Sequence, residues 1–193
     1  MPNLKPFRDY DEHDVVNLFT LKDQSDVNKG TFVKLTSGQG WVSTDEPFGD
    51  TQSTAGSVNY VGRAVSNRYI VQAGLGIAGS GDAPIGMTLY DMKETDENGE
   101  KLLFNPQKAA EMQTAISGQA VPVATRGVFL YSGTTLHAAT NVAPDAGNVL
   151  YAANNGDITT TVADHFAKKV GVCLGAKGSD NYVLIKIDCD PTQ

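Results

Sequence analysis

Residues 105–131, NPQKAAEMQTAISGQAVPVATRGVFLY, hold the only convincing helix pattern in the sequence and then turn directly into a strand pattern. Asn105 is a favourable N-cap, Pro106 suits the first helical position, and Gly118 stands just past the expected end. The apolar residues recur at helical spacing and predict one narrow buried face: Ala109, Met112 and Ile116. We therefore expect a short helix at about 105–117 that packs on a sheet.

The sequence on both sides of this helix has the pattern of β-structure. Residues 126–131 (RGVFLY) combine β-branched and aromatic side chains, and residues 29–35 (KGTFVKL) repeat much of that order. Each segment is followed by a loop and by further strand patterns, which indicates two related units. The expected fold class is mainly β, with two related β-sandwich or barrel-like units and one short α-helix between them.

The expected organisation divides the chain into four parts. They are an N-terminal arm (1–20), a first β-unit (21–104), the helix (105–118) and a second β-unit (119–193). The first β-unit includes a long surface loop at 43–57, rich in Thr, Ser, Gly and Asp, and long loops often carry function. The pattern is compatible with two separate cores or with one core shared by both units.

Glycines recur at equivalent places in three strand patterns: VGRAV at 61–65, IGMTL at 85–89 and VGVCL at 170–174. A glycine repeated at one place in a strand predicts a bulge or a close approach of two backbones. We expect one of these features wherever the pattern occurs.

Two hairpins are expected in the second half of the chain. Asn155 and Gly156 stand between strand patterns at 149–152 and 158–162, and this dipeptide is typical of a tight hairpin turn. The segment 170–174 and the strand pattern that follows at 182–187 predict the second hairpin.

The composition indicates a folded, acidic protein. The 193 residues carry a net charge of −7 with an isoelectric point near 4.8, whereas nucleic-acid-binding faces concentrate Lys and Arg. No apolar run of about 18 residues and no signal-peptide pattern occurs, so we expect a soluble chain without membrane or direct nucleic-acid contacts. Cys173 is expected in the core and Cys189 near a fraying end, and a bridge between them is left open.

Residues 74–79, GLGIAG, match the dinucleotide-binding fingerprint, and Glu94 stands at about the distance expected of a ribose-binding acid. That motif must open a helix whose N-terminus holds a pyrophosphate, whereas SGDAP at 80–84 cannot propagate a helix. We expect a flexible glycine loop here, and no cofactor.

The remaining polar groups do not form a recognisable site. The acidic cluster at 91–100 lacks the ligand spacing of a calcium loop, so Asn98 and Gly99 are expected to form a turn with a solvated acidic rim. The histidines stand far apart, without a second histidine at ligand spacing or a nucleophile elbow: His13, His137 and His165. No catalytic residue, metal ligand or enzymatic activity is expected.

Several stretches carry a resemblance to a known family: VPVATRGV at 121–128, GNVLY at 147–151 with Asn155-Gly156, VGVCL at 170–174 and YVLIKI at 182–187. They resemble the capsid cement or head decoration proteins of tailed bacteriophages. Further stretches are similar to marine and cyanobacterial phage members of that group: FRDY at 7–10, EHDVVNLF at 12–19, DENGEK at 96–101 and NPQKAAEM at 105–112.

The resemblance implies a non-enzymatic structural virion protein. Such a protein binds the major capsid protein on the outer surface of the expanded head, commonly as a homotrimer, and reinforces the head against internal DNA pressure. It would be found on the outer capsid surface of the virion and, during assembly, in the host cytoplasm. An acidic β-protein rich in Gly and Thr suits this role, because many weakly bound copies gain from multivalent attachment.

The N-terminal arm is the candidate for the capsid contact or for a subunit swap, through Phe7, Arg8, Tyr10, Val15, Leu18 and Phe19. A terminal strand of the same fold is the equal alternative for this segment. For the whole chain, a receptor- or carbohydrate-binding virion module is the runner-up, with Trp41 and Tyr60 as stacking platforms. A hydrolase, which needs convergent Ser, His and acid side chains, ranks third.

Overall fold

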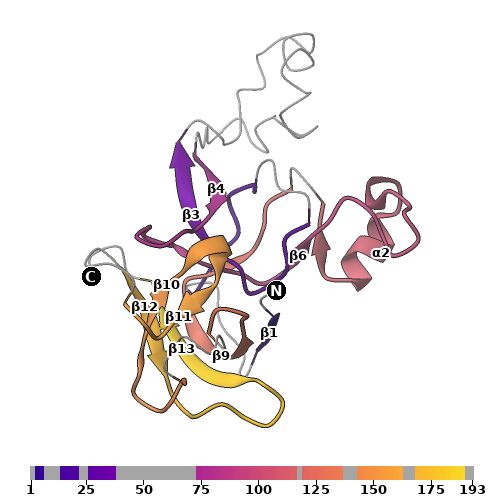
Figure 1. The fold of residues 1–193 in the computed structure, drawn as a ribbon. Coiled ribbons are helices and arrows are strands. Elements are labelled where there is room, and N and C mark those ends of the chain that lie inside the picture. Colours follow the sequence, from indigo (N-terminus) through magenta and orange to yellow (C-terminus); the bar gives the residue numbers. More distant parts are fainter. Residues whose placement is uncertain are drawn as a thin grey trace.

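The structure, a computed structural model, describes residues 3–6, 14–21, 26–37, 73–116, 119–136, 143–162 and 168–189. These residues confirm the mainly β fold: two antiparallel sheets pack together, and a small lobe containing one short helix projects from them (Figure 1). Some sequence features lie outside the described residues: the 43–57 loop, Tyr60, the VGRAV motif at 61–65 and all three histidines.

The larger sheet is antiparallel and has six strands. In spatial order they are β1 (Asn3–Pro6), β9 (Arg126–Ser132), β13 (Val183–Asp188), β12 (Lys169–Cys173), β10 (Val149–Ala152) and β11 (Ile158–Thr159). Successive residues of a strand face opposite sides, so Phe129 and Tyr131 of β9 are buried while Val128 and Leu130 lie half-buried on the outer face. The expected hairpin between 170–174 and 182–187 is confirmed as β12 and β13.

The smaller sheet is also antiparallel and has five strands. In spatial order they are β2 (Val15–Val16), β8 (Val123–Ala124), β5 (Gly86–Thr88), β3 (Phe32–Ser37) and β4 (Ala73–Ile77). A separate parallel pair is formed by β6 (Asp91–Met92) and β7 (Thr114–Ala115). The helical elements are η1 (Leu102–Phe104), α2 (Pro106–Glu111) and η2 (Asn154–Gly156).

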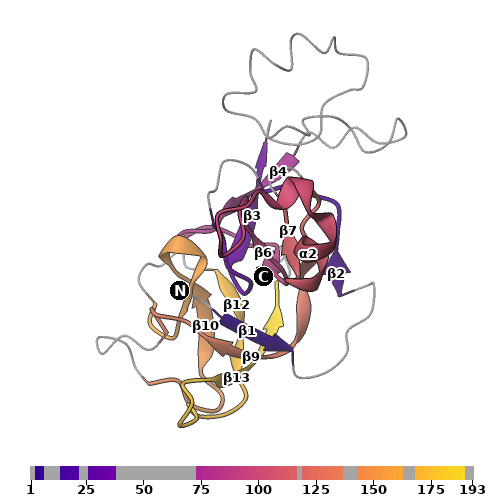
Figure 2. The same ribbon diagram turned by 90° about the vertical axis from the view of Figure 1, so that its right-hand side faces the viewer.

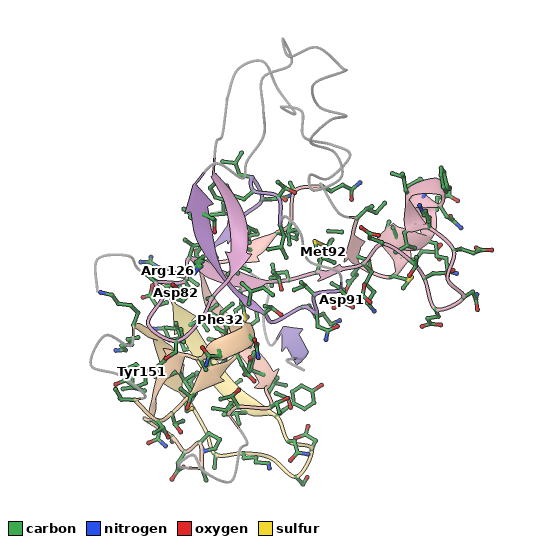
Figure 3. All side chains as sticks on the ribbon, turned by 45° about the horizontal axis from the view of Figure 1, so that its top comes forward. Phe32, Asp82, Asp91, Met92, Arg126 and Tyr151 are labelled. Carbon is green, nitrogen blue, oxygen red and sulfur yellow. The ribbon has the colours of Figure 1, made fainter. Side chains whose placement is uncertain are left out.

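The two sheets enclose one hydrophobic core. Its buried side chains come from both sheets, with Phe32 and Met87 on one side and Phe129, Tyr131 and Leu150 on the other. The rings of Phe32 and Tyr131 meet edge to face, with centroids 6.2 Å apart and an interplanar angle of 66°, as aromatic quadrupoles favour. The sequence was compatible with two separate cores or with one shared core, and the structure has the shared core. Figure 3 shows Phe32 between the two sheets.

The chain crosses between the sheets, so the sheets do not coincide with the two predicted β-units. β8 belongs to the five-stranded sheet and β9 to the six-stranded one, with Thr125 between them. Thr125 N–H donates to the carbonyl of Asp14 at 2.8 Å, and its own carbonyl accepts from Cys189 N–H at 3.0 Å. Likewise, β1 joins the larger sheet and β2 the smaller one. The first and last described strands, β1 and β13, therefore belong to the same sheet.

Close backbone approach is confirmed at the two recurring glycines that the structure describes. A Cβ added at Gly86 would lie 2.2 Å from the carbonyl oxygen of Ala124, and a Cβ at Gly171 would lie 2.2 Å from that of Lys186. Real Cβ atoms essentially never come within 3.0 Å of another heavy atom in this way. Glycine is thus required at each position because the neighbouring strand leaves no room for a Cβ atom, and not because the φ angle is positive.

The hairpin at Asn155 and Gly156 is also confirmed. Both residues take positive φ angles, 60° and 68°, which a tight turn between twisted antiparallel strands requires. The turn connects β10 to β11, which pair through Tyr151 with Thr159 and Ala152 with Ile158. Its Gly156 N–H also donates to the carbonyl of Ala78 at 2.8 Å, so the turn is bonded to the chain that follows β4.

The helix is shorter than the predicted 105–117. Asn105 caps it as expected, accepting from the N–H of Lys108 at 3.4 Å, but α2 ends at Glu111. Gln113 takes a φ of 51°, and the chain then leaves as β7 to pair with β6. Ile116 still packs against Leu102 and Ala109, but it follows β7 and is not part of the helix. The predicted third helical turn is lost to strand pairing.

The expectation of a flexible glycine loop at 74–79 is wrong. Most of this segment is β4, which pairs with β3 from Ala73 to Ile77. Leu75 is fully buried, while Gly76 lies opposite Lys34 on the other face. Side chains of a strand alternate between its two faces, but three of these six residues are glycines, so the alternation is hard to recognise in the sequence. As expected, no helix opens after the motif.

Cys173 and Cys189 are both free, and both are buried in the shared core. Cys189 is therefore not part of a fraying end: its N–H is bonded to Thr125, and its Sγ lies 4.0 Å from the carbonyl of Val170. Burial raises the pKa of Cys173 to about 11 and that of Cys189 to about 12. Both thiols are held in the neutral, unreactive form in the native protein.

We expect the free energy of unfolding to fall as the pH rises above about 9. Burial, followed by the charge of Asp157, raises the pKa of the Tyr131 hydroxyl well above its ordinary 10.0. Above the ordinary values of 9.0 for Cys and 10.0 for Tyr, the unfolded chain releases protons that the native chain keeps, so stability decreases. Each buried group adds a slope of about 1.4 kcal/mol per pH unit.

Urea unfolding between about pH 8 and pH 11 measures this slope. Cys189→Ala should make the profile shallower, because that thiol no longer contributes. A wild-type stability that stays constant up to about pH 11 would contradict the burial of these groups.

Candidate interaction site

The structure describes three of the six candidate contact residues of the N-terminal arm. Phe7, Arg8 and Tyr10 lie outside the described residues. The structure places the other candidates apart: Val15 packs against the shared core, Phe19 packs against a second cluster beneath the five-stranded sheet, and Leu18 is 45% exposed. The carbonyl of Phe19 also accepts from the N–H of Val121 at 3.0 Å, which supports the terminal-strand alternative for residues 14–21.

A cleft of about 360 Å³ opens between the ends of the two sheets. Eight of its ten lining residues are of polar types: Asp26, Val27, Asn28, Thr31, Ile77, Thr134, Thr135, Asn154, Asn155 and Asp157. Several of these groups already bond within the protein. Asn154 Oδ1 accepts from Ser80 N–H at 3.1 Å, and Thr31 Oγ1 donates to the carbonyl of Asn28 at 2.7 Å.

Asp157 is the most strongly bonded group of this cleft. Its buried carboxylate accepts three hydrogen bonds, from Tyr131 Oη at 2.9 Å, from Ile158 N–H at 2.8 Å and from Thr135 N–H at 2.7 Å. A charge this well satisfied stabilises the turn that carries it. We therefore interpret the cleft as a structural seam between the sheets.

The turn after β4 occupies the place where a dinucleotide motif would hold phosphate. The carboxylate of Asp82 accepts from Gly79 N–H at 2.7 Å and from Lys34 Nζ at 2.8 Å. The hydrogen bond from Lys34 is the main cause of a lowered Asp82 pKa, so this carboxylate is ionised at neutral pH. A phosphate approaching Gly79 would meet a negative charge, which argues against cofactor binding at the GLGIAG motif.

Among the described residues, the most prominent surface feature is the lobe, which we define as residues 91–116. Figure 1 shows it leaving the sheets to one side, and in Figure 2 it faces the viewer. Its base is the parallel pair of β6 and β7, labelled by Asp91 and Met92 in Figure 3. Met92 and Ala115 are buried in the second cluster, and Met92 exchanges backbone hydrogen bonds of 2.7 and 2.9 Å with Val27. The lobe is therefore firmly attached to the body.

The lobe also has its own small core and an internal brace. Leu102, Ala109 and Ile116 are buried together beneath α2. Asp96 organises the turn that was expected at Asn98 and Gly99: its Oδ1 accepts from the N–H groups of Asn98 and Glu100, both at 2.8 Å. Its Oδ2 pairs with Lys108 of α2, which ties the turn to the helix.

We expect this brace to loosen in acid. The hydrogen bond from Lys108 is the main cause of a lowered Asp96 pKa, so the stabilisation is present above the ordinary value of 3.8 and is lost as the pH falls through the lowered value. Asp96→Asn should reproduce the loss at neutral pH. Hydrogen exchange at Asn98 and Glu100 should become about tenfold faster or more, as expected for losing a charged hydrogen bond. Unchanged exchange in the variant would contradict the role of Asp96.

Two apolar side chains stand on the surface of the lobe. In η1, Leu102 is buried, whereas Leu103 is 43% and Phe104 is 81% exposed. Exposed glutamates share the lobe: Glu94, Glu97, Glu100 and Glu111. The lobe holds six acidic residues against three basic ones, and thus a net charge of −3 of the chain's −7. This combination of an apolar tip and an acidic surround makes the lobe the best candidate interaction site in the described part of the chain.

The acidic cluster of the lobe does not form a metal centre within the described residues, where no group of three or more His, Cys, Asp or Glu side chains is placed to hold an ion. Asp91 bonds to the N–H of Lys29 at 2.7 Å and Asp96 pairs with Lys108, so these carboxylates serve the fold. In the same residues, no helix is long and apolar enough to cross a bilayer.

No protein-family model, curated protein or solved structure matches this chain. The structural evidence for an interaction site is therefore the geometry of the lobe. That geometry singles out Leu103 and Phe104, which the sequence did not. The available signal was the apolar run LLF at 102–104 among charged residues, but periodicity alone does not tell which of three consecutive apolar residues faces outward.

Proposed function

We propose that this chain is a structural virion protein that binds the outer surface of an expanded phage capsid and stabilises the head. The observation that carries the proposal is the lobe, an exposed apolar tip on a braced projection from a shared β core. An aromatic group presented in this way suits attachment to another protein, because aromatic residues are enriched at interface centres. We take the capsid as that surface because the strand and turn motifs resemble those of capsid cement proteins.

The shared core supports the same role. A protein that resists internal pressure must transmit load through its own body, and here both sheets and the N-terminal strands are joined by backbone hydrogen bonds and one core. Many copies, as homotrimers, would each add a weak contact, and multivalency would make the attachment strong. The partners in this proposal are the major capsid protein and further copies of the chain.

Co-sedimentation tests the proposal. The purified chain is mixed with expanded capsids of the phage that encodes it, prepared without this chain, and the bound fraction is measured against concentration. Saturable binding, together with a higher temperature of capsid disruption, is the expected result. A folded chain that does not sediment with capsids would overturn the proposal, and glycan and receptor binding would then be the next activities to measure.

A further inference from the structure

The tip of the lobe leaves more apolar surface in water than its own fold requires. Leu102 fills the lobe core, yet the next two residues, Leu103 and Phe104, turn outward. Single exposed apolar residues are ordinary, but an adjacent Leu and Phe on a projecting, otherwise charged element are not explained by folding. Removing the Phe104 side chain from water is favourable, so a partner that covers it gains affinity.

The backbone beneath this tip is fixed before any partner arrives. The N–H of Phe104 donates to the carbonyl of Lys101 at 3.1 Å, and the N–H of Asn105 donates to that of Leu102 at 3.0 Å. Leu102 N–H in turn donates to the carbonyl of Glu94 at 3.0 Å, in the segment that follows β6. A side chain presented on a rigid turn loses little conformational freedom on binding, so most of its burial energy becomes affinity.

The charges around the tip define the chemistry of the partner. The four exposed glutamates of the lobe give it a negative surface, which repels nucleic-acid phosphates and anionic lipid headgroups. A protein surface with Lys or Arg side chains around an apolar pocket is complementary to both features. Lys93 and Lys108 are paired with Asp91 and Asp96, and the exposed Lys101 beside the tip leaves the net charge of the lobe at −3.

We propose that Phe104, supported by Leu103, is the anchor of the lobe, and that it inserts into an apolar pocket ringed by basic residues on the capsid protein. This inference rests on the proposed function and names its contact. It also moves the contact from the N-terminal arm, where Leu18 is the exposed candidate among the described residues, to the lobe.

Capsid co-sedimentation of the full chain with single substitutions tests the anchor. Phe104→Ala should weaken binding about 30-fold or more, as for a central interface residue. The matched control is Leu174→Ala, which removes a side chain that is 43% exposed, as Leu103 is, but lies outside the lobe beyond β12. The control should bind as wild type. Replacing both Glu97 and Glu100 with Gln should slow association at low salt, and added salt should reduce the difference.

Each outcome separates the two proposals. If wild type binds and Phe104→Ala binds equally well, the anchor is wrong while the capsid role stands. If wild type does not bind, the capsid role fails, and the anchor fails with it. Sedimentation velocity of the chain alone is the last measurement. If Phe104→Ala forms a smaller oligomer than wild type, a second copy of the chain covers the tip. That outcome also contradicts the proposal that Phe104 inserts into a pocket of the capsid protein.

Discussion

Replacing Asp157 with alanine is expected to lower the free energy of unfolding by about 3–5 kcal/mol. The substitution removes a buried carboxylate that accepts from Tyr131 Oη, Ile158 N–H and Thr135 N–H at 2.7–2.9 Å. All three donors would lose this acceptor, and buried donors that lose an acceptor cost more than the net value of a hydrogen bond. Because Asp157 joins η2 to β11 and contacts β9, the loss acts on the seam between the sheets.

Urea denaturation at pH 7 measures this effect, and two variants separate its causes. Tyr131→Phe removes one donor and leaves the carboxylate with two, so it should cost only about 1.5–3 kcal/mol. The double variant should be less destabilised than the sum of the single effects, because the pair has already been broken. A loss below about 1 kcal/mol for Asp157→Ala would show that the carboxylate does not hold the seam.

Replacing Gly171 with alanine is expected to cost about 3 kcal/mol or more. A Cβ there would lie 2.2 Å from the carbonyl oxygen of Lys186 and 3.0 Å from the Cα of Ile187. Both atoms belong to the backbone of β13, so no rotamer change relieves the clash and β12 must separate from β13. Gly86→Ala should behave similarly in the other sheet, where the obstacle is the carbonyl of Ala124.

Thermal unfolding of the variants measures these losses, with an expected drop of about 6–12 °C for each. Gly175→Ala is the matched control, because a Cβ at that position meets no atom within 4 Å. It should unfold within about 2 °C of wild type. Equal stability of Gly171→Ala and Gly175→Ala would mean that the strands are farther apart than the structure places them.

The sequence by itself determined the features that depend on local conformation. Asn155 and Gly156 tolerate positive φ, so they identified their turn, and Asn105 with Pro106 identified the start of α2. The β-branched and aromatic side chains of 126–131 likewise identified β9. In each case the decisive interaction lies within a few residues, and the sequence pattern is its direct consequence.

Only the tertiary structure decided the features that depend on distant partners. The GLGIAG segment becomes a strand because β3 offers a ladder of hydrogen bonds, and α2 ends early because β7 pairs with β6. The core shared by the two sheets requires strands from both halves of the chain. Phe104 faces outward because Leu102 already fills the small core of the lobe, and the sequence does not show which neighbours occupy that space. Pairing and packing over long separations settle these choices, because their free energies exceed local preferences.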